Sequence, residues 1–196
     1  MSLLPLAFIS EYPYNDADDF AARVELAADN LNVNPSWLMA VMYRESALEA
    51  DAANKDKNGN VIAAGLNQIQ AATATGLGTS ISALLSMTAI KQMDYVEEYF
   101  KEAIQEAGRT PKSVGDMYLL NFYPAAVGKP YSYVIYKAGS ASANGNAILQ
   151  DETGSITAGS VRDAVNAFIP WEYKPLVAPG VYGLAAFFII GGLLSS

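Results

Sequence analysis

The sequence predicts a mainly helical domain with a small β-hairpin, followed by one C-terminal transmembrane helix. Apolar residues recur at helical spacing along most of the chain, Asn58-Gly59 lies in a stretch without that periodicity, and the C-terminus is a long apolar run. We divide the 196 residues into an N-terminal segment (1–14), a domain (15–168), a linker (169–175) and a membrane span (176–194).

The helices are predicted from apolar spacing and from start and stop residues. Asn34-Pro35 is typical of a helix start, because an N-cap residue precedes a proline at the first helical position. Gly108 is typical of a helix end. The helices predicted on these grounds cover residues 16–31, 35–48, 88–107, 110–123 and 160–168.

Two stretches between the helices lack helical periodicity. In the first, Asn58-Gly59 predicts a type I′ hairpin turn. The spacing of Asn54, Asp56 and Asn58 also resembles the first half of a calcium loop, but Gly65 occupies the position of the required bidentate acid, so we predict no metal site. The second stretch, 131–157, is rich in Gly, Ser and Asn and is expected to be an extended excursion.

The predicted membrane span, 176–194, is nearly all apolar and follows Lys174, the last charged residue. Nineteen helical residues would span roughly 28 Å, about the thickness of the hydrocarbon core of a bilayer. Trp171 and Tyr173 beside Lys174 are typical of an interfacial anchor, so the lipid bilayer is an expected partner. A buried hairpin or core helix is the alternative, because Pro179 and several glycines interrupt the run.

Composition excludes several kinds of chemistry. The chain has no histidine and no cysteine, which excludes Ser-His-Asp and Cys-His nucleophiles and zinc sites of the usual type. Its 12 basic and 20 acidic side chains give a net charge of −8, which argues against nucleic acid as a partner. Catalysis would therefore fall mostly to Asp, Glu, Tyr or Lys, and no cofactor is predicted.

One carboxyl group lies on an apolar helix face. Leu38, Val41 and Met42 form an apolar stripe, and Glu45 projects between the last two of them. Apolar surroundings disfavour the charged carboxylate and raise its pKa, which is the environment of a glycosidase general acid. Other readings stay open: Glu45 could be paired with a cation at the edge of the stripe or emerge at the helix end, and Glu49 shares the same face.

The segment that follows gives this carboxyl a context. Glu45-Ser46 is followed twenty residues later by Gly-Leu-Asn-Gln-Ile-Gln at 65–70. Together the two motifs resemble the lytic transglycosylases, lysozyme-like enzymes that cleave the glycan strands of peptidoglycan. Asn67 stands where that family usually has methionine. A third family motif, tyrosine followed by Asn-Ala-Gly, has its counterpart at Tyr123, although Pro124 replaces the asparagine.

The resemblance covers roughly residues 20–137 and implies both the lysozyme-like fold and the site. The implied catalytic residue is Glu45. The implied substrate-binding residues are Ser46, Gly65, Leu66, Asn67, Gln68, Ile69, Asn121 and Tyr123.

The resemblance also implies a reaction with a single carboxyl group. Glu45 would protonate the glycosidic oxygen between N-acetylmuramic acid and N-acetylglucosamine, then act as base on the C6 hydroxyl. The product is a 1,6-anhydro sugar. Tyr123 would hydrogen-bond Glu45 or the acetamido group, and Gln68 would orient sugar substituents. The implied partner is therefore the peptidoglycan glycan strand.

Three other functions remain open from the sequence. A hydrolytic muramidase would need a second acid, for which Glu49, Asp51 and Asp56 are candidates. A catalytically inactive lysozyme-like domain would bind the wall or serve as a structural virion protein. An unrelated membrane-anchored helical adaptor would use Glu45 only in an ion pair.

The expected location is a membrane of a bacteriophage particle or the bacterial cell envelope. The apolar segment 3–9 is short, contains Pro5 and has no preceding basic residue, so it does not resemble a secretory signal. A wall-degrading enzyme without such a signal suggests delivery by a phage, with virion proteins as further partners.

Overall fold

The computed structural model describes residues 5–170 and Tyr173. It is mainly helical, with two small sheets. The helices, including three short 3-10 helices (η), are η1 (Ile9–Glu11), α1 (Ala17–Leu31), α2 (Pro35–Ser46), α3 (Ala71–Gly76), α4 (Ile81–Leu85), α5 (Ala89–Ala107), α6 (Val114–Phe122), η2 (Pro124–Ala126), α7 (Ala141–Gly145), η3 (Ala147–Leu149) and α8 (Ala158–Phe168). The strands are β1 (Ala53–Lys55), β2 (Val61–Ala64), β3 (Ile69–Gln70), β4 (Val134–Tyr136) and β5 (Ile156–Thr157).

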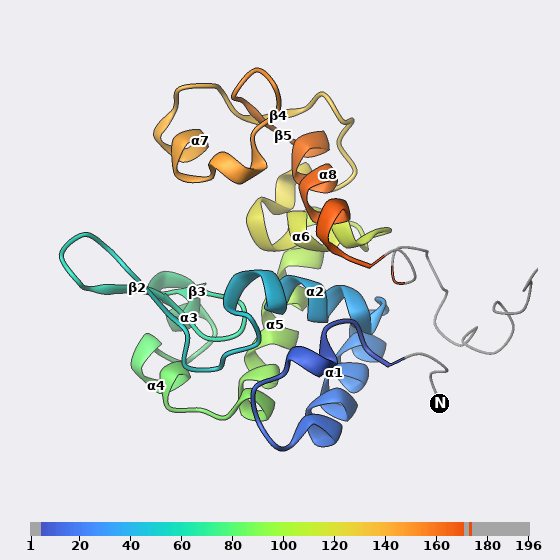
Figure 1. Cartoon of the computed structure of the whole chain (residues 1–196), viewed down its shortest axis with the longest axis vertical. Coiled ribbons are helices and arrows are strands. Elements are labelled where there is room, and N and C mark those ends of the chain that lie inside the picture. The colour runs from blue at the N-terminus through green and yellow to red at the C-terminus, as the bar shows by residue number, and fades with distance from the viewer. Residues whose placement is uncertain (1–4, 171–172, 174–196) are drawn as a thin grey trace, which may run out of the picture.

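The main core lies where α1, α2, α5 and α6 pack together. α1 contacts α5 and α2, while α6 contacts α2, α5 and α8. The buried face of α1 carries Phe20, Val24 and Leu31, the residues whose helical spacing predicted this element. Figure 1 shows β4, β5, α7 and α8 at the top of the view, and the three-stranded sheet at mid-height, to the left of α2. This arrangement is consistent with the predicted lysozyme-like fold.

The predicted hairpin is present, but its turn differs from the type I′ turn expected. β1 and β2 pair antiparallel, with Ala53 opposite Ala64, and β3 extends the sheet. The turn has Gly59 in the left-handed region at φ +86°, while Asn58 has a negative φ. The cause is Asp56, whose Oδ1 accepts hydrogen bonds from the amides of Asn58 (2.8 Å) and Asn60 (2.9 Å).

Three helix ends also differ from the predicted ones. α2 ends at Ser46, because Ala47 and Leu48 adopt left-handed backbone angles. α6 begins at Val114, after the N-cap Ser113. The N-cap of α8 is Thr157, and the predicted cap, Ser160, is its capping-box partner.

The stretch 131–157 was expected to be an extended excursion, but it contains four short elements, β4, α7, η3 and β5. β4 and β5 pair antiparallel, with Val134 opposite Thr157. Buried Ala143, Leu149 and Ile156 connect these elements to the main core. Apolar residues too widely spaced to show a helical or strand period therefore hold this region together.

The predicted fold class is wrong in its transmembrane helix. Among residues 5–170 and Tyr173, no helix is both long enough and apolar enough to cross a membrane. The longest described helix, α5, has 19 residues, but charged side chains recur along it and would have to enter the bilayer. These are Lys91, Asp94, Glu97, Glu98, Lys101, Glu102 and Glu106. The span predicted at 176–194 lies outside the described residues.

Candidate active site

Glu45 lies in a cavity of about 510 Å³ with two walls. One wall is formed by α2, the three-stranded sheet, the start of α3 and α5, and the other by α6, β4 and α7 with the residue after it. The lining residues are Glu45, Asn54, Ala63, Asn67, Gln68, Ile69, Gln70, Thr73, Tyr99, Tyr118, Asn121, Phe122, Tyr136, Ser142 and Asn146. Most of them are polar but uncharged, and such a surface suits a ligand rich in hydroxyl and amide groups.

Glu45 is half-buried in the last turn of α2. Desolvation by burial raises the pKa of its carboxyl group. Three weaker effects lower the pKa: a hydrogen bond with the Tyr118 side chain, the charge of Arg44 and a hydrogen bond with the Asn121 side chain. Burial prevails, so Glu45 keeps its proton to a higher pH than an exposed glutamate does.

Two tyrosines face this carboxyl group from α5 and α6. Burial, followed by the nearby charge of Glu45, raises the pKa of Tyr118 well above its ordinary value. The same two effects raise the pKa of Tyr99 to about 12, and its hydroxyl donates to the Asn121 carbonyl oxygen at 3.0 Å. Both phenols are therefore neutral hydrogen-bond donors throughout the physiological pH range.

Arg44 lies against Tyr118 and hydrogen-bonds its side chain. Its guanidinium carbon is 5.4 Å from the ring centroids of both Tyr118 and Phe168. This places a cation near Glu45. No ion pair with a carboxylate is present for Arg44 in the described part of the chain.

Three of the predicted binding residues do not line the cavity, namely Ser46, Gly65 and Leu66. They fix the position of Glu45 instead. The Ser46 hydroxyl lies 3.0 Å from the carbonyl oxygens of both Met42 and Leu66, and thus joins the end of α2 to the segment after β2. Gly65 has a φ of +77°, and a Cβ atom there would clash with the Gln92 side chain. Only glycine satisfies both constraints.

Gln92 holds the same segment from α5, and the motifs did not reveal it. Its side chain is 2% exposed, accepts from the Leu66 amide at 2.9 Å and donates to the carbonyl oxygens of Ala50 and Leu84 at 2.5 and 2.8 Å. A signal was present in the sequence. Gln92 lies on the buried face of its helix, as Glu45 does, so the reasoning applied to the glutamate would also have identified the glutamine.

The remaining predicted residues have different surroundings. Asn67 is 3% exposed and donates from Nδ2 to Asn121 Oδ1 at 3.3 Å. Gln68 adopts a left-handed φ of 47° and donates from Nε2 to the carbonyl oxygens of Ala52 and Gly65. Ile69 is buried in β3. Four of the predicted binding residues line the Glu45 cavity, namely Asn67, Gln68, Ile69 and Asn121.

Tyr123 lies beside the cavity and does not line it. Its ring packs edge-to-face on Tyr136, which does line the cavity, with 6.0 Å between the ring centroids. The tyrosine that hydrogen-bonds Glu45 is Tyr118, which lies on α6 three residues before Asn121. The sequence offered only a weak signal for it, a tyrosine and an asparagine three residues apart on one helix.

The other acids considered as a second carboxylate do not line this cavity. Glu49 is exposed, and Asp51 lies near Tyr14 in a separate hollow. Asp56 accepts the amides of its own turn, and these hydrogen bonds lower its pKa. The described residues also contain no group of three or more acidic side chains suited to a metal ion.

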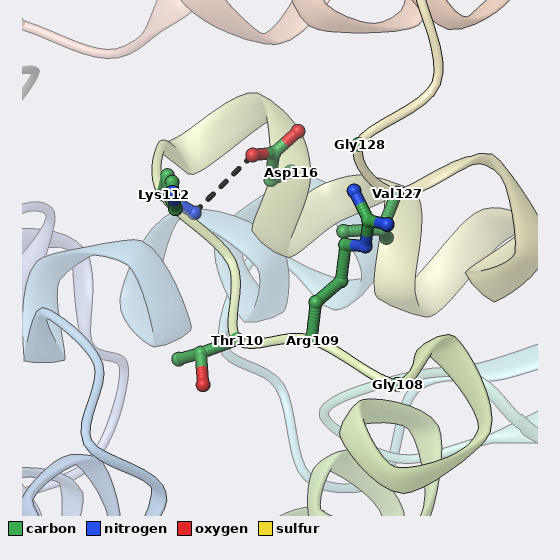
Figure 2. A pocket seen from close by; sticks show the side chains of 7 residues that line it. All are labelled: Gly108, Arg109, Thr110, Lys112, Asp116, Val127 and Gly128. Atoms are coloured by element: carbon green, nitrogen blue, oxygen red, sulfur yellow. Dashed lines mark hydrogen bonds between the residues drawn. The ribbon is translucent and has the colours of Figure 1, made fainter.

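A second hollow, of about 380 Å³, lies between the end of α5 and the start of α6. Figure 2 shows Arg109 and Lys112 among the residues that line it, with the Lys112 backbone amide donating to Asp116. The other Asp116 oxygen is paired with Arg162 Nε at 2.9 Å. Because this carboxylate is already paired, the hollow provides no free acid, and the cavity around Glu45 is the stronger candidate for an active site.

A comparison with known families agrees with this geometry. Residues 23–114 match the transglycosylase SLT domain. The match includes Glu45, the segment 65–70 and Tyr99, so this part of the chain is similar to the transglycosylase SLT domain. No curated protein matches the chain. The SLT match ends at the first residue of α6, so Tyr118 and Asn121 lie beyond it.

Proposed function

We propose that the protein is a peptidoglycan lytic transglycosylase in which Glu45 is the only catalytic carboxyl group. One observation carries the proposal: among the described residues that line the cavity, Glu45 is the only carboxylate. Retaining and inverting glycosidases generally use two carboxyl groups, about 5–5.5 Å or 6.5–9.5 Å apart. A lytic transglycosylase needs one, because the sugar's own C6 hydroxyl replaces water as the nucleophile.

The first step is proton transfer from Glu45 to the glycosidic oxygen that links N-acetylmuramic acid to N-acetylglucosamine. The bond between C1 and that oxygen breaks, and the leaving sugar departs as an alcohol carrying the proton. The raised pKa supports this role, because the carboxyl group must hold a proton at the pH of the reaction.

The second step closes a ring within the muramic acid residue. The C6 oxygen attacks C1, and the proton of the C6 hydroxyl passes to the Glu45 carboxylate. The product is a 1,6-anhydro sugar, no water is consumed, and Glu45 returns to its protonated state. The glutamate thus acts first as an acid and then as a base.

The residues around Glu45 stabilise its charged form between these steps. The Tyr118 hydroxyl, the Asn121 amide and the positive charge of Arg44 all favour the carboxylate. They oppose burial, so the proton can leave as well as return. This balance suits a group that changes roles within one turnover.

The proposal is tested by digesting purified peptidoglycan with the full chain and with its Glu45→Gln variant, followed by mass spectrometry of the products. We expect anhydro-muropeptides from the wild type and none from the variant. Products with reducing ends would instead indicate a hydrolase. Wild-type protein that sediments with peptidoglycan but releases no product would indicate a wall-binding domain.

We further propose that the protein acts in the bacterial cell envelope, because its substrate is found there. Immunodetection in fractionated cells that produce the full chain tests this. Protein confined to the cytosolic fraction, with no loss of wall, would contradict it.

A further inference from the structure

Asn67 occupies a position that is costly for an amide. It is 3% exposed, and its Oδ1 atom has no hydrogen-bond partner in the described part of the chain. A buried acceptor without a partner costs about 1–3 kcal/mol. An apolar side chain of similar size would avoid that cost, so the amide must have another use at this site.

The one hydrogen bond that the Asn67 side chain makes is to a neighbour of Glu45. Its Nδ2 atom donates to Asn121 Oδ1 at 3.3 Å. The Asn121 side chain in turn hydrogen-bonds the Glu45 carboxyl group. The Tyr99 hydroxyl holds the Asn121 backbone by donating to its carbonyl oxygen. The three side chains therefore form a chain from Asn67 through Asn121 to Glu45.

An asparagine amide has two ends of almost equal size, so its orientation depends on the partners of each end. Because Asn67 donates to Asn121, the oxygen of Asn121 is held toward Asn67. Its NH₂ group is then the end that faces Glu45. Without that donor, Asn121 is free to turn its oxygen to Glu45 and accept a hydrogen bond from the protonated carboxyl group.

We propose that Asn67 is a positioning residue that fixes the Asn121 amide with its NH₂ group toward Glu45 and thereby favours the carboxylate over the protonated acid. The inference rests on the proposed function for its purpose. A buried acid must still release its proton to the glycosidic oxygen. The Asn67–Asn121 pair favours that release, because it opposes the preference for the protonated acid that burial creates. The assignment concerns this chain in particular, since Asn67 replaces the methionine usual at this position.

Other groups near Glu45 make no hydrogen bond with the Asn67 side chain. Arg44 on α2 and Tyr118 on α6 lower the Glu45 pKa. Tyr99 on α5 and Tyr136 on β4 also line the cavity. A substitution at Asn67 therefore leaves in place the interactions of Arg44 and Tyr118 with Glu45.

The test is a carbon-13 NMR titration of the Glu45 carboxyl group in the full chain. We compare the wild type with Asn67→Leu, Asn121→Leu and the double variant. Each single substitution should raise the Glu45 pKa, and the double variant should raise it no further than Asn121→Leu does, because the two residues act in series. Asn144→Leu, at an exposed asparagine outside the cavity, is the matched control and should leave the pKa unchanged.

A Glu45 pKa that is unchanged in Asn67→Leu but raised in Asn121→Leu would overturn the proposal, as would additive shifts. Asn67→Met is the second variant if the leucine variant does not fold, since its unbranched side chain fills space adaptably and also lacks a donor. The titration needs no substrate, so it is informative even if the protein fails to cleave peptidoglycan.

In an active enzyme, the alkaline limb of kcat/KM should move to higher pH in Asn67→Leu, which a purely structural role would not produce. Cleavage of peptidoglycan with an unmoved limb would reject the role of Asn67 while leaving the proposed function intact.

Discussion

The wall that carries Glu45 is held by hydrogen bonds to backbone atoms, whereas the opposite wall reaches the cavity through side chains. On the first wall, Ser46 joins α2 to the segment after β2, and Gln92 holds that segment from α5. On the second, Tyr118 and Asn121 extend from α6, and Tyr136 packs edge-to-face on Phe122. The SLT match covers the first wall and ends at the first residue of α6.

This difference separates two tasks. Glu45 must occupy one position, and many buried contacts hold it there. In the proposed mechanism, the opposite wall adjusts the proton affinity of Glu45 and offers polar groups to the substrate, tasks that different side chains can perform. We therefore expect substitutions in the first wall to abolish activity or stability and those in the second to change activity by degrees.

The largest expected effect is on activity in Glu45→Gln. Loss of a general acid lowers the reaction rate by roughly 10²- to 10⁴-fold, so we expect about a thousandfold decrease in kcat/KM on purified glycan strands. The matched control is Glu49→Gln. Glu49 is exposed beyond the end of α2, so its variant should stay within about twofold of the wild type. Equal losses in both variants would contradict the assignment of Glu45.

The next effect is on the stability of the first wall. Gly65→Ala introduces a Cβ at φ +77° against Gln92, and we expect a loss of about 3 kcal/mol in the free energy of unfolding. Gly59→Ala is the control, because it has the same left-handed strain at φ +86° but open space around it, and should cost only about 1 kcal/mol. Urea denaturation measures both. Equal losses in the free energy of unfolding would show that the Gln92 side chain moves aside at no energetic cost.

A smaller effect distinguishes two tyrosines. Tyr118→Phe removes a hydrogen bond that lowers the Glu45 pKa, so that pKa should rise and the alkaline limb of kcat/KM should move to higher pH. At neutral pH, we expect a change in rate of about threefold to tenfold, the size of one hydrogen bond of about 1 kcal/mol. Tyr123→Phe should leave the alkaline limb of the kcat/KM profile at its wild-type pH. The reverse result would restore Tyr123 as the partner of Glu45.

The smallest expected effect is a gain of stability in Glu45→Gln. Burial raises the folded-state pKa of Glu45 above its unfolded value. The folded protein therefore loses stability as pH rises between those two values, and the loss persists above both. Because glutamine carries no charge, the variant should melt a few degrees higher than the wild type at neutral pH, at roughly 2–4 °C per kcal/mol. The melting temperatures of the two proteins should converge at pH values below the unfolded-state pKa of Glu45. A difference in melting temperature that does not vary with pH would reject this explanation.

The sequence predicted more of the first wall than of the second, although Gln92 on the first wall was missed and Asn121 on the second was predicted. Glu45 and the segment 65–70 carry local patterns, namely a polar residue on an apolar stripe and a glycine before a run of amides. Tyr118 reaches Glu45 only because α6 packs on α2, and no local pattern records that contact. The elements of 131–157 are likewise two to five residues long, too short for periodicity to appear.

The most direct test of the central claim is digestion of peptidoglycan by the full chain in water labelled with heavy oxygen. If the Glu45 carboxyl group passes its proton to the leaving sugar and the C6 hydroxyl attacks C1, the new muramic acid end carries no label and is lighter than the hydrolysed end by one water. A labelled reducing end that is absent from the Glu45→Gln digest would contradict the single-carboxylate account and show that water is the nucleophile.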